Sequence, residues 1–219
     1  MMLPLRIGRP EAKPARVLAI GAHPDDIEIG CAGTILKLIE QEAISEFLWV
    51  VLSGKGERAD EARRSAEALL EEVPRSEVVV RDFPDGFFPY EGQRIKDFFE
   101  QMKADFSPNV VFTHQRADLH QDHRLSCELT WNTFRDHLIL EYEVPKYDGD
   151  MSAPNTFVPI EESLHRRKID HLMSYFGSQL SKRWFKEELF SSLLRLRGME
   201  CNSPSSYAEA FFCRKAILA

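Results

Sequence analysis

Short apolar runs alternate with amphipathic segments along the N-terminal part of the chain. The runs are rich in Val, Ile, Leu and aromatic residues, which is typical of strands buried on both faces, and the segments between them repeat apolar residues at helical spacing. Four strand-then-helix units in series predict a parallel sheet with right-handed crossovers. The predicted strands are 16–22, 46–52, 77–82 and 109–113, and the predicted helices are 30–42, 57–72, 93–106 and 124–134.

The C-terminal part of the chain has a looser pattern. The segment 146–159 is rich in Pro, Asn, Asp and Ser and is too long for a routine connection, so it is a candidate substrate lid. The other elements that we expect are a strand over 137–144, helices over 161–175 and 185–197, and a short element near 207–212.

The whole pattern predicts an α/β fold: a single-domain, Rossmann-like parallel sheet flanked by helices, with a C-terminal extension that forms part of the substrate pocket. Residues 1–15 contain three prolines and several charges and read as an irregular N-terminal arm, so the predicted domain spans 16–219. A chain of 219 residues can bury one substantial core. The sequence permits a homo-oligomer and leaves the oligomeric state open.

Composition excludes several classes of protein. The formal net charge is −7 and no basic block is present, which argues against binding to nucleic acid. No apolar run approaches the roughly 20 residues of a membrane span, and the start lacks the apolar core of a signal peptide. The four cysteines have no C-x-x-C spacing, as expected of free thiols in a reducing compartment. We therefore expect a cytoplasmic protein with no membrane span.

Two polar clusters follow predicted strands. The first is His23-Pro24-Asp25-Asp26, directly after the strand 16–22, and the second is the stretch 118–124, after the strand 109–113. Open α/β sheets place their active sites at the carboxyl ends of their strands. The sequence therefore predicts that the two clusters meet in one site.

The residue types in these clusters fit a catalytic zinc site, which takes three N or O donors and keeps one position open. His23, Asp26 and His123 can supply that set. Asp25 is then a spare carboxylate that can act as general base on a water. His120 is a spare imidazole that can stabilise an oxyanion as an imidazolium, with Asp122 available to orient it and raise its pKa. These parts together indicate metal-assisted hydrolysis of an amide or ester carbonyl.

Each fragment alone also has a purely structural interpretation. The His-x-x-His spacing of residues 120 and 123 is common by chance and can be a capped helix start. The His-Pro-Asp-Asp turn can place an Asp that caps the following helix. His114 follows a strand directly and can simply be packed, and His137, His165 and His171 have no ligand spacing. The occurrence of both clusters at strand ends favours the functional interpretation.

The residues 22–31 and 120–123 resemble the zinc-dependent N-acetylglucosaminyl deacetylase family, the PIG-L or LmbE-like enzymes. Arg58 and Glu61 are similar to the R-x-x-E of that family, and residues 83–86 match its Pro-Asp-Gly loop. Weaker matches follow in the family's order at 142–145, 154–158, 175–179 and 207–211. The resemblance thus covers most of the chain from Arg16 onward.

The resemblance implies zinc on His23, Asp26 and His123, Asp25 as the base, and His120 as the oxyanion group with Asp122 behind it. It also implies Arg58 as a contact to hydroxyl or phosphate groups of the substrate. An i,i+3 salt bridge between Arg58 and Glu61 is the alternative for that arginine. Iron or another divalent ion can replace zinc in such a donor set.

Two positions depart from the pattern of the family. Gln121 stands where many members have proline, and Asp118 stands where the mycothiol-type enzymes have a tyrosine that contributes to acid chemistry. The segment 146–159 also lacks the Ser/Thr-rich stretch of the sugar branch, which leaves the exact amino sugar open.

The hypothesis is a zinc hydrolase that removes acetyl from an N-acetylated amino sugar, a glycoconjugate or a sugar nucleotide. The first alternative is a metal-dependent hydrolase of another small-metabolite amide. The second is a nucleotide-binding module without catalysis, which lacks support because no G-x-G-x-x-G follows the first strand.

Overall fold

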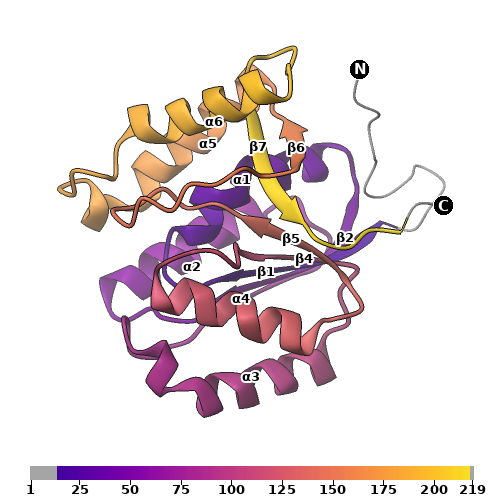
Figure 1. Ribbon diagram of the computed structural model, residues 1–219, viewed down its shortest axis with the longest axis vertical. Helices are drawn as coiled ribbons and strands as arrows, with labels where there is room; N and C mark the ends of the chain where they lie inside the picture. The colour runs from indigo at the N-terminus through magenta and orange to yellow at the C-terminus, as the bar shows by residue number, and fades with distance from the viewer. Residues whose placement is uncertain (1–13, 218–219) are drawn as a thin grey trace.

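The computed structural model describes residues 14–217 and contains a seven-stranded sheet between two layers of helices (Figure 1). The strands are β1 (Ala15–Gly21), β2 (Ile44–Val51), β3 (Ser76–Val80), β4 (Val110–His114), β5 (Leu138–Tyr142), β6 (Thr156–Pro159) and β7 (Ala208–Cys213). The helices are α1 (Asp26–Glu40), α2 (Glu57–Leu69), α3 (Gly92–Asp105), α4 (Gln121–Thr133), α5 (Glu162–Tyr175) and α6 (Glu187–Glu200), with short 3-10 turns η1 (Phe88–Tyr90) and η2 (Gly177–Gln179).

The order of the strands across the sheet positions the site. It is β3-β2-β1-β4-β5-β7-β6, with β1 to β5 parallel and β7 antiparallel to both β5 and β6. The chain runs outward from β1 through β2 to β3 and then returns to β4 on the other side of β1. The order therefore reverses between β1 and β4, and the loops that leave their carboxyl ends border one crevice.

Successive side chains of β1 supply both layers of the core. Val17 and Ala19 pack with α1, α2 and α5 residues, whereas Leu18 and Ile20 pack with α3 residues. This alternation follows from the two-residue period of a strand. Figure 1 shows α1, α2, α5 and α6 on one face of the sheet and α3 and α4 on the other. Because both faces are covered, the strand reads as a continuous apolar run.

The structure confirms the predicted fold class, a mostly parallel sheet flanked by helices. Several predicted boundaries differ from the structure. The helix predicted at 30–42 begins at Asp26, and the helix predicted at 185–197 spans Glu187–Glu200. The helix placed at 124–134 begins at Gln121, since His120 provides its N-cap. The expected lid 146–159 contains the strand β6, which pairs with β7. The strand β7 is about 50 residues away in the chain, so the local sequence of β6 does not indicate this pairing.

The predicted N-terminal arm, residues 1–15, lies almost wholly outside the described residues, and β1 begins at Ala15. The four cysteines are free, and Cys31 and Cys127 are buried. Within residues 14–217, no helix has both the length and the apolar content needed to cross a membrane.

Helix α1 is held closely against the sheet and the C-terminal elements. The buried ammonium of Lys168 contacts the Glu209 carboxylate and the Ile29 carbonyl oxygen, each at 2.6 Å. Glu209 also accepts hydrogen bonds from the backbone N–H groups of Gly33 and Thr34, at 2.8 and 2.6 Å. An ion pair with this many partners is satisfied although it is buried. It fixes α1, which begins at the candidate site, to β7.

Gly30 allows α1 to approach β5. A Cβ atom added at residue 30 would lie 2.2 Å from Cδ2 of Tyr142, a fully buried ring whose hydroxyl donates to the Ile20 carbonyl oxygen. We expect Gly30→Ala to lower the free energy of unfolding by about 1–3 kcal/mol through overpacking. Denaturant melts followed by circular dichroism measure the change.

The matched control is Gly92→Ala at the start of α3, where an added Cβ has no neighbour within 4 Å. This variant should be neutral or slightly more stable, because alanine favours the helix. Equal melting behaviour of the two variants would contradict the close contact between α1 and Tyr142.

Candidate metal and catalytic centre

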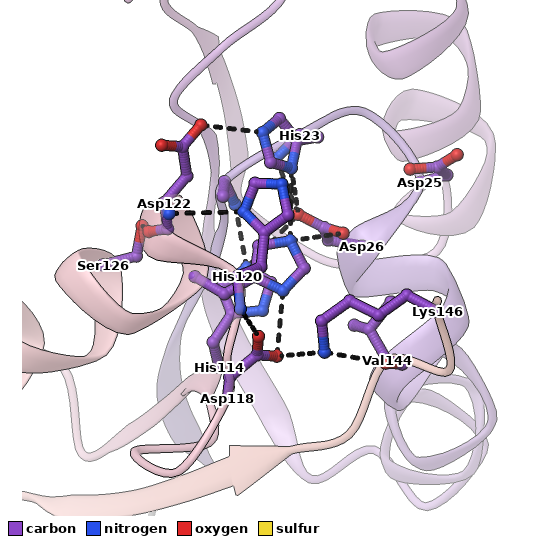
Figure 2. A network of polar contacts seen from close by, with 12 residues as sticks. His23, Asp25, Asp26, His114, Asp118, His120, Asp122, Ser126, Val144 and Lys146 are labelled. Carbon is purple, nitrogen blue, oxygen red and sulfur yellow. Dashed lines mark hydrogen bonds and ion pairs between the residues drawn. The ribbon is translucent and has the colours of Figure 1, made fainter. Parts of the chain in front are cut away.

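The turn after β1 points the side chains of two adjacent residues, Asp25 and Asp26, in different directions. Asp25 has a φ of 93°, in the left-handed region that non-glycine residues rarely occupy, and such strain gathers at functional sites. Asp26 turns toward the histidines, whereas Asp25 points away from them (Figure 2). The Asp25 side chain makes no capping hydrogen bond to α1. The helix-cap interpretation of this turn is therefore wrong.

Three predicted ligands, His23, Asp26 and His123, converge from the two polar clusters. Nδ1 of His23 lies 3.2 Å from Nε2 of His123. Oδ2 of Asp26 lies 3.5 Å from that His23 nitrogen, and Oδ1 of Asp26 lies 3.5 Å from that His123 nitrogen. Nitrogen ligands about 2.05 Å from a tetrahedral zinc ion lie about 3.3 Å apart. The donor atoms therefore already have the spacing that a divalent cation requires.

Acidic partners hold both imidazoles in a ligating orientation. Nδ1 of His123 pairs with Asp118 at 3.0 Å, which leaves its Nε2 facing the other donors. Nε2 of His23 contacts the carboxylates of Asp122 and Asp85, each at 3.1 Å, which leaves its Nδ1 facing them. A carboxylate behind a histidine fixes the tautomer and the ring orientation of a metal ligand.

The electrostatics of the two rings differ. Burial lowers the pKa of His123 to about 4, so this ring is neutral at pH 7 and has a lone pair to offer. Burial opposes the charged form of His23 too, but the adjacent carboxylates of Asp122, Asp26 and Asp85 raise its pKa above the ordinary value. A metal ion that binds here must displace that proton.

His120 is the N-cap of α4, and its Nδ1 accepts a hydrogen bond of 3.3 Å from the backbone N–H of Asp122. His120 therefore does cap the start of a helix, and it uses Nδ1 to do so. In the neutral ring the proton then resides on Nε2, which leaves a donor available. His120 and His123 both line the same pocket, as their spacing predicts.

The predicted pairing of the Asp122 carboxylate with His120 is wrong. That carboxylate accepts from the backbone N–H groups of Gly86 and Phe88, at 2.6 and 3.1 Å, and contacts His23. The Pro-Asp-Gly loop folds over the start of α4, so its backbone N–H groups donate to the Asp122 carboxylate oxygens. Asp122 thus orients His23 with its side chain and contacts His120 with its backbone.

Arg58 lies beside Asp25, where its guanidinium donates to the Pro24 carbonyl oxygen at 2.5 Å and lies 3.4 Å from the Asp25 carboxylate. The alternative salt bridge with Glu61 is wrong, since Glu61 is buried and accepts from Ser178 instead. Burial raises the pKa of Asp25 to about 7, an effect that the Arg58 guanidinium partly opposes. A carboxylate with that pKa is suited to general base chemistry near neutral pH.

The centre opens into a pocket of about 660 Å³. The C-terminal part of the chain supplies one wall of it, as the predicted extension requires, and its role in binding a substrate stays a prediction. Its residues include Lys146, Tyr147 and Asp148 from the expected lid and Gln179, Lys182 and Trp184 from the stretch after α5. Such a volume is typical of small-molecule sites.

Several buried residues of the site did not stand out in the sequence. His114 stacks on His123 with 3.9 Å between ring centroids, and its Nε2 lies 3.2 Å from Asp26. Asp118 was visible as the first residue of the second polar cluster and as a departure from a family pattern, but without a role of its own. Lys146 was visible only as part of a polar segment. Their roles depend on contacts between distant segments, which no local pattern encodes.

Comparison with known proteins identifies the family. Residues 18–134 match the PIG-L family, described as GlcNAc-PI de-N-acetylase, so the chain belongs to the PIG-L family of deacetylases. The chain is also similar to the uncharacterized deacetylase YaiS of Escherichia coli (strain K12), with 27% identity over 170 residues, which cover 73% of this chain and 89% of YaiS. The resemblance inferred from the motifs is confirmed.

Solved structures share the fold. The N,N'-diacetylchitobiose deacetylase of Pyrococcus horikoshii has a TM-score of 0.69 at 21% identity, with 90% of this chain and 83% of that chain covered. GalB of Pseudomonas putida KT2440, a 4-carboxy-2-hydroxymuconate hydratase, also has a TM-score of 0.69, at 19% identity, with 93% and 98% covered. One fold thus occurs in a deacetylase and in a hydratase, so the reaction must be argued from the site.

The donor spacing predicts that the protein purified without a histidine tag binds about one zinc ion per chain. Asp26→Asn should abolish this binding, because the amide is a far weaker ligand than the carboxylate. Elemental analysis after dialysis measures the ratio.

His165→Ala is the matched control, since His165 lies on α5, stacks on Tyr207 and contacts Ser191. It should bind metal as the unaltered protein does. Zinc retained in the Asp26 variant would mean that the ligands lie elsewhere.

Proposed function

We propose that this chain is a metal-dependent hydrolase, with zinc as the expected ion, that removes the acetyl group from an N-acetylated amino sugar and releases acetate and a free amine. Membership of the PIG-L family supports deacetylation. The observation that carries the proposal is the joint placement of three metal donors, a buried carboxylate with a raised pKa and a histidine N–H donor around one pocket.

A divalent ion held by His23, Asp26 and His123 would lower the pKa of a water molecule and polarise the acetyl carbonyl. Asp25 then takes a proton from the water as its oxygen attacks the carbonyl carbon. His120 donates from Nε2 to the oxyanion that develops on the carbonyl oxygen. The carbon–nitrogen bond breaks, and Asp25 returns its proton to the leaving amine.

The pocket supports a sugar substrate of some size. Trp184 and Tyr147 offer aromatic faces to the apolar side of a sugar ring, and the side chains of Arg58 and Lys182 offer donors to hydroxyl or phosphate oxygens. Arg58 has a second role beside the base, because its charge opposes the rise in the pKa of Asp25. A volume of about 660 Å³ leaves room for an aglycone next to the N-acetylated sugar.

Hydration of a carbon–carbon double bond is the second candidate, since the GalB hydratase shares the fold. The same base and metal donors would serve to activate water for that reaction. Acetate release from a panel of N-acetylhexosamine glycosides and nucleotide sugars supports deacetylation. Loss of ultraviolet absorbance from a conjugated hydroxydienoate without acetate release would instead support hydration.

We expect Asp25→Asn to reduce kcat by about 10²- to 10⁴-fold, because the amide cannot accept the proton of water. Asparagine tolerates a positive φ, so the turn keeps its shape, which an alanine would strain. Metal content and kcat are measured on the same sample.

Asp60→Asn serves as control, since Asp60 is exposed on α2 and pairs only with Arg63 in the described structure. This variant should keep its activity. If metal content and rate fell together in the Asp25 variant, that residue would be a ligand and not the base.

A further inference from the structure

A second set of charges lies behind the metal donors, on the side of His123 that faces away from them. Asp118 has a fully buried side chain, and its Oδ2 contacts both Nδ1 of His123 at 3.0 Å and the Lys146 ammonium at 2.9 Å (Figure 2). Its Oδ1 accepts from the backbone N–H of His120 at 2.8 Å. One carboxylate therefore touches two histidines of the site and one lysine of the pocket wall.

Lys146 joins this carboxylate to a second one. Its ammonium lies 2.7 Å from Oδ2 of Asp150, and that oxygen also accepts from the backbone N–H of Leu119 at 2.7 Å. The side chains of Lys146 and Asp150 are only 11% and 4% exposed, so water screens this group poorly. Two carboxylates thus share one ammonium and together hold the turn that precedes α4.

We propose that Lys146 is a positioning residue of the metal centre: it holds Asp118 and Asp150 together, so that Asp118 keeps Nε2 of His123 aimed at the metal position. The inference rests on the proposed metal-dependent function. It also joins the pocket wall to the metal donors, because the neighbours Tyr147 and Asp148 line the substrate pocket.

Loss of the ammonium leaves two buried carboxylates in close proximity without a countercharge. Their mutual repulsion and the cost of leaving them unpaired would push one of them away. Asp118 would then no longer fix the ring of His123, and the orientation of a metal-bound imidazole depends on such a partner.

The direction of the effect separates positioning from simple electrostatics. Removal of a nearby positive charge should by itself strengthen the binding of a cation. Removal of a positioning residue should weaken it. Metal affinity therefore reports on the role of Lys146 even before any substrate is known.

The test is competition between the purified protein and a chelator for Zn²⁺, in the unaltered protein and in Lys146→Met. We expect the variant to bind zinc about 10- to 100-fold more weakly. The visible spectrum of the Co²⁺-loaded variant should change as well, since the geometry of the His123 ligand is altered. In acetate-release assays at saturating metal, kcat should fall more than KM rises.

Two further variants provide the controls. Lys182→Met removes a cation that lines the same pocket and has no contact with Asp118 in the described structure, so its zinc affinity should be unchanged or higher. Lys146→Met combined with Asp150→Asn removes the repulsion and should recover part of the lost affinity. Where the single Met variant does not fold, Lys146→Gln tests the same direction.

The possible results distinguish this inference from the proposed function. If the unaltered protein binds no divalent ion, the proposed function fails. If it binds zinc and Lys146→Met binds equally or more tightly, only the positioning role fails. A double variant as weak as the single one would also contradict the role assigned to Asp150.

Discussion

The parallel pairing of β1 with β4 is the constraint on which the site depends. Val17, Leu18 and Ala19 pair with Val110, Val111 and Phe112, so the two strands end side by side. The polar turns that follow them must then share one crevice, although they are far apart in the sequence. The fold thereby brings His23 and Asp26 to His123 without a long loop. Side chains held by rigid elements keep their spacing better than side chains on long loops. The nearest atoms of His23 and Asp26 lie 3.2 and 3.5 Å from Nε2 of His123.

Most of the buried carboxylates around this crevice have close partners that offset the cost of their burial. Asp26 faces the histidines, Asp122 accepts from two backbone N–H groups, and Asp118 contacts Lys146. Asp25 is less well compensated, since the Arg58 guanidinium lies 3.4 Å away and burial raises the pKa of Asp25 to about 7. Carboxylates in different surroundings have different pKa values, and Asp25, which lines the pocket and has a pKa near 7, is suited to carry a proton.

The sequence carried the information that is local and periodic. The strands β1 to β4, the two polar clusters and the meeting of the three candidate metal donors could all be predicted, because an apolar run and the residues at its end are adjacent in the chain. The pairing of β6 with β7 could not be predicted, nor could the contact of Asp122 with Gly86 or that of Lys146 with Asp118. These interactions join segments whose proximity is a result of the whole fold. The departure at position 118 was visible in the sequence, but its meaning required the neighbouring lysine.

Chemistry and specificity come from different parts of the chain. The family match covers residues 18–134, which include every metal donor as well as Asp25 and His120. The wall with Tyr147, Lys182 and Trp184 lies beyond that match, and under the proposed function it would face the part of a substrate that does not react. Because this fold occurs in both a deacetylase and a hydratase, the residues that line the pocket, and not the fold, must set the reaction and the substrate. Lys146 belongs to the wall by its place in the chain and to the metal centre by its contact with Asp118. The Lys146 ammonium therefore joins the pocket wall to Asp118, and under the proposed positioning role a change in the wall that moves this lysine would also alter the orientation of His123.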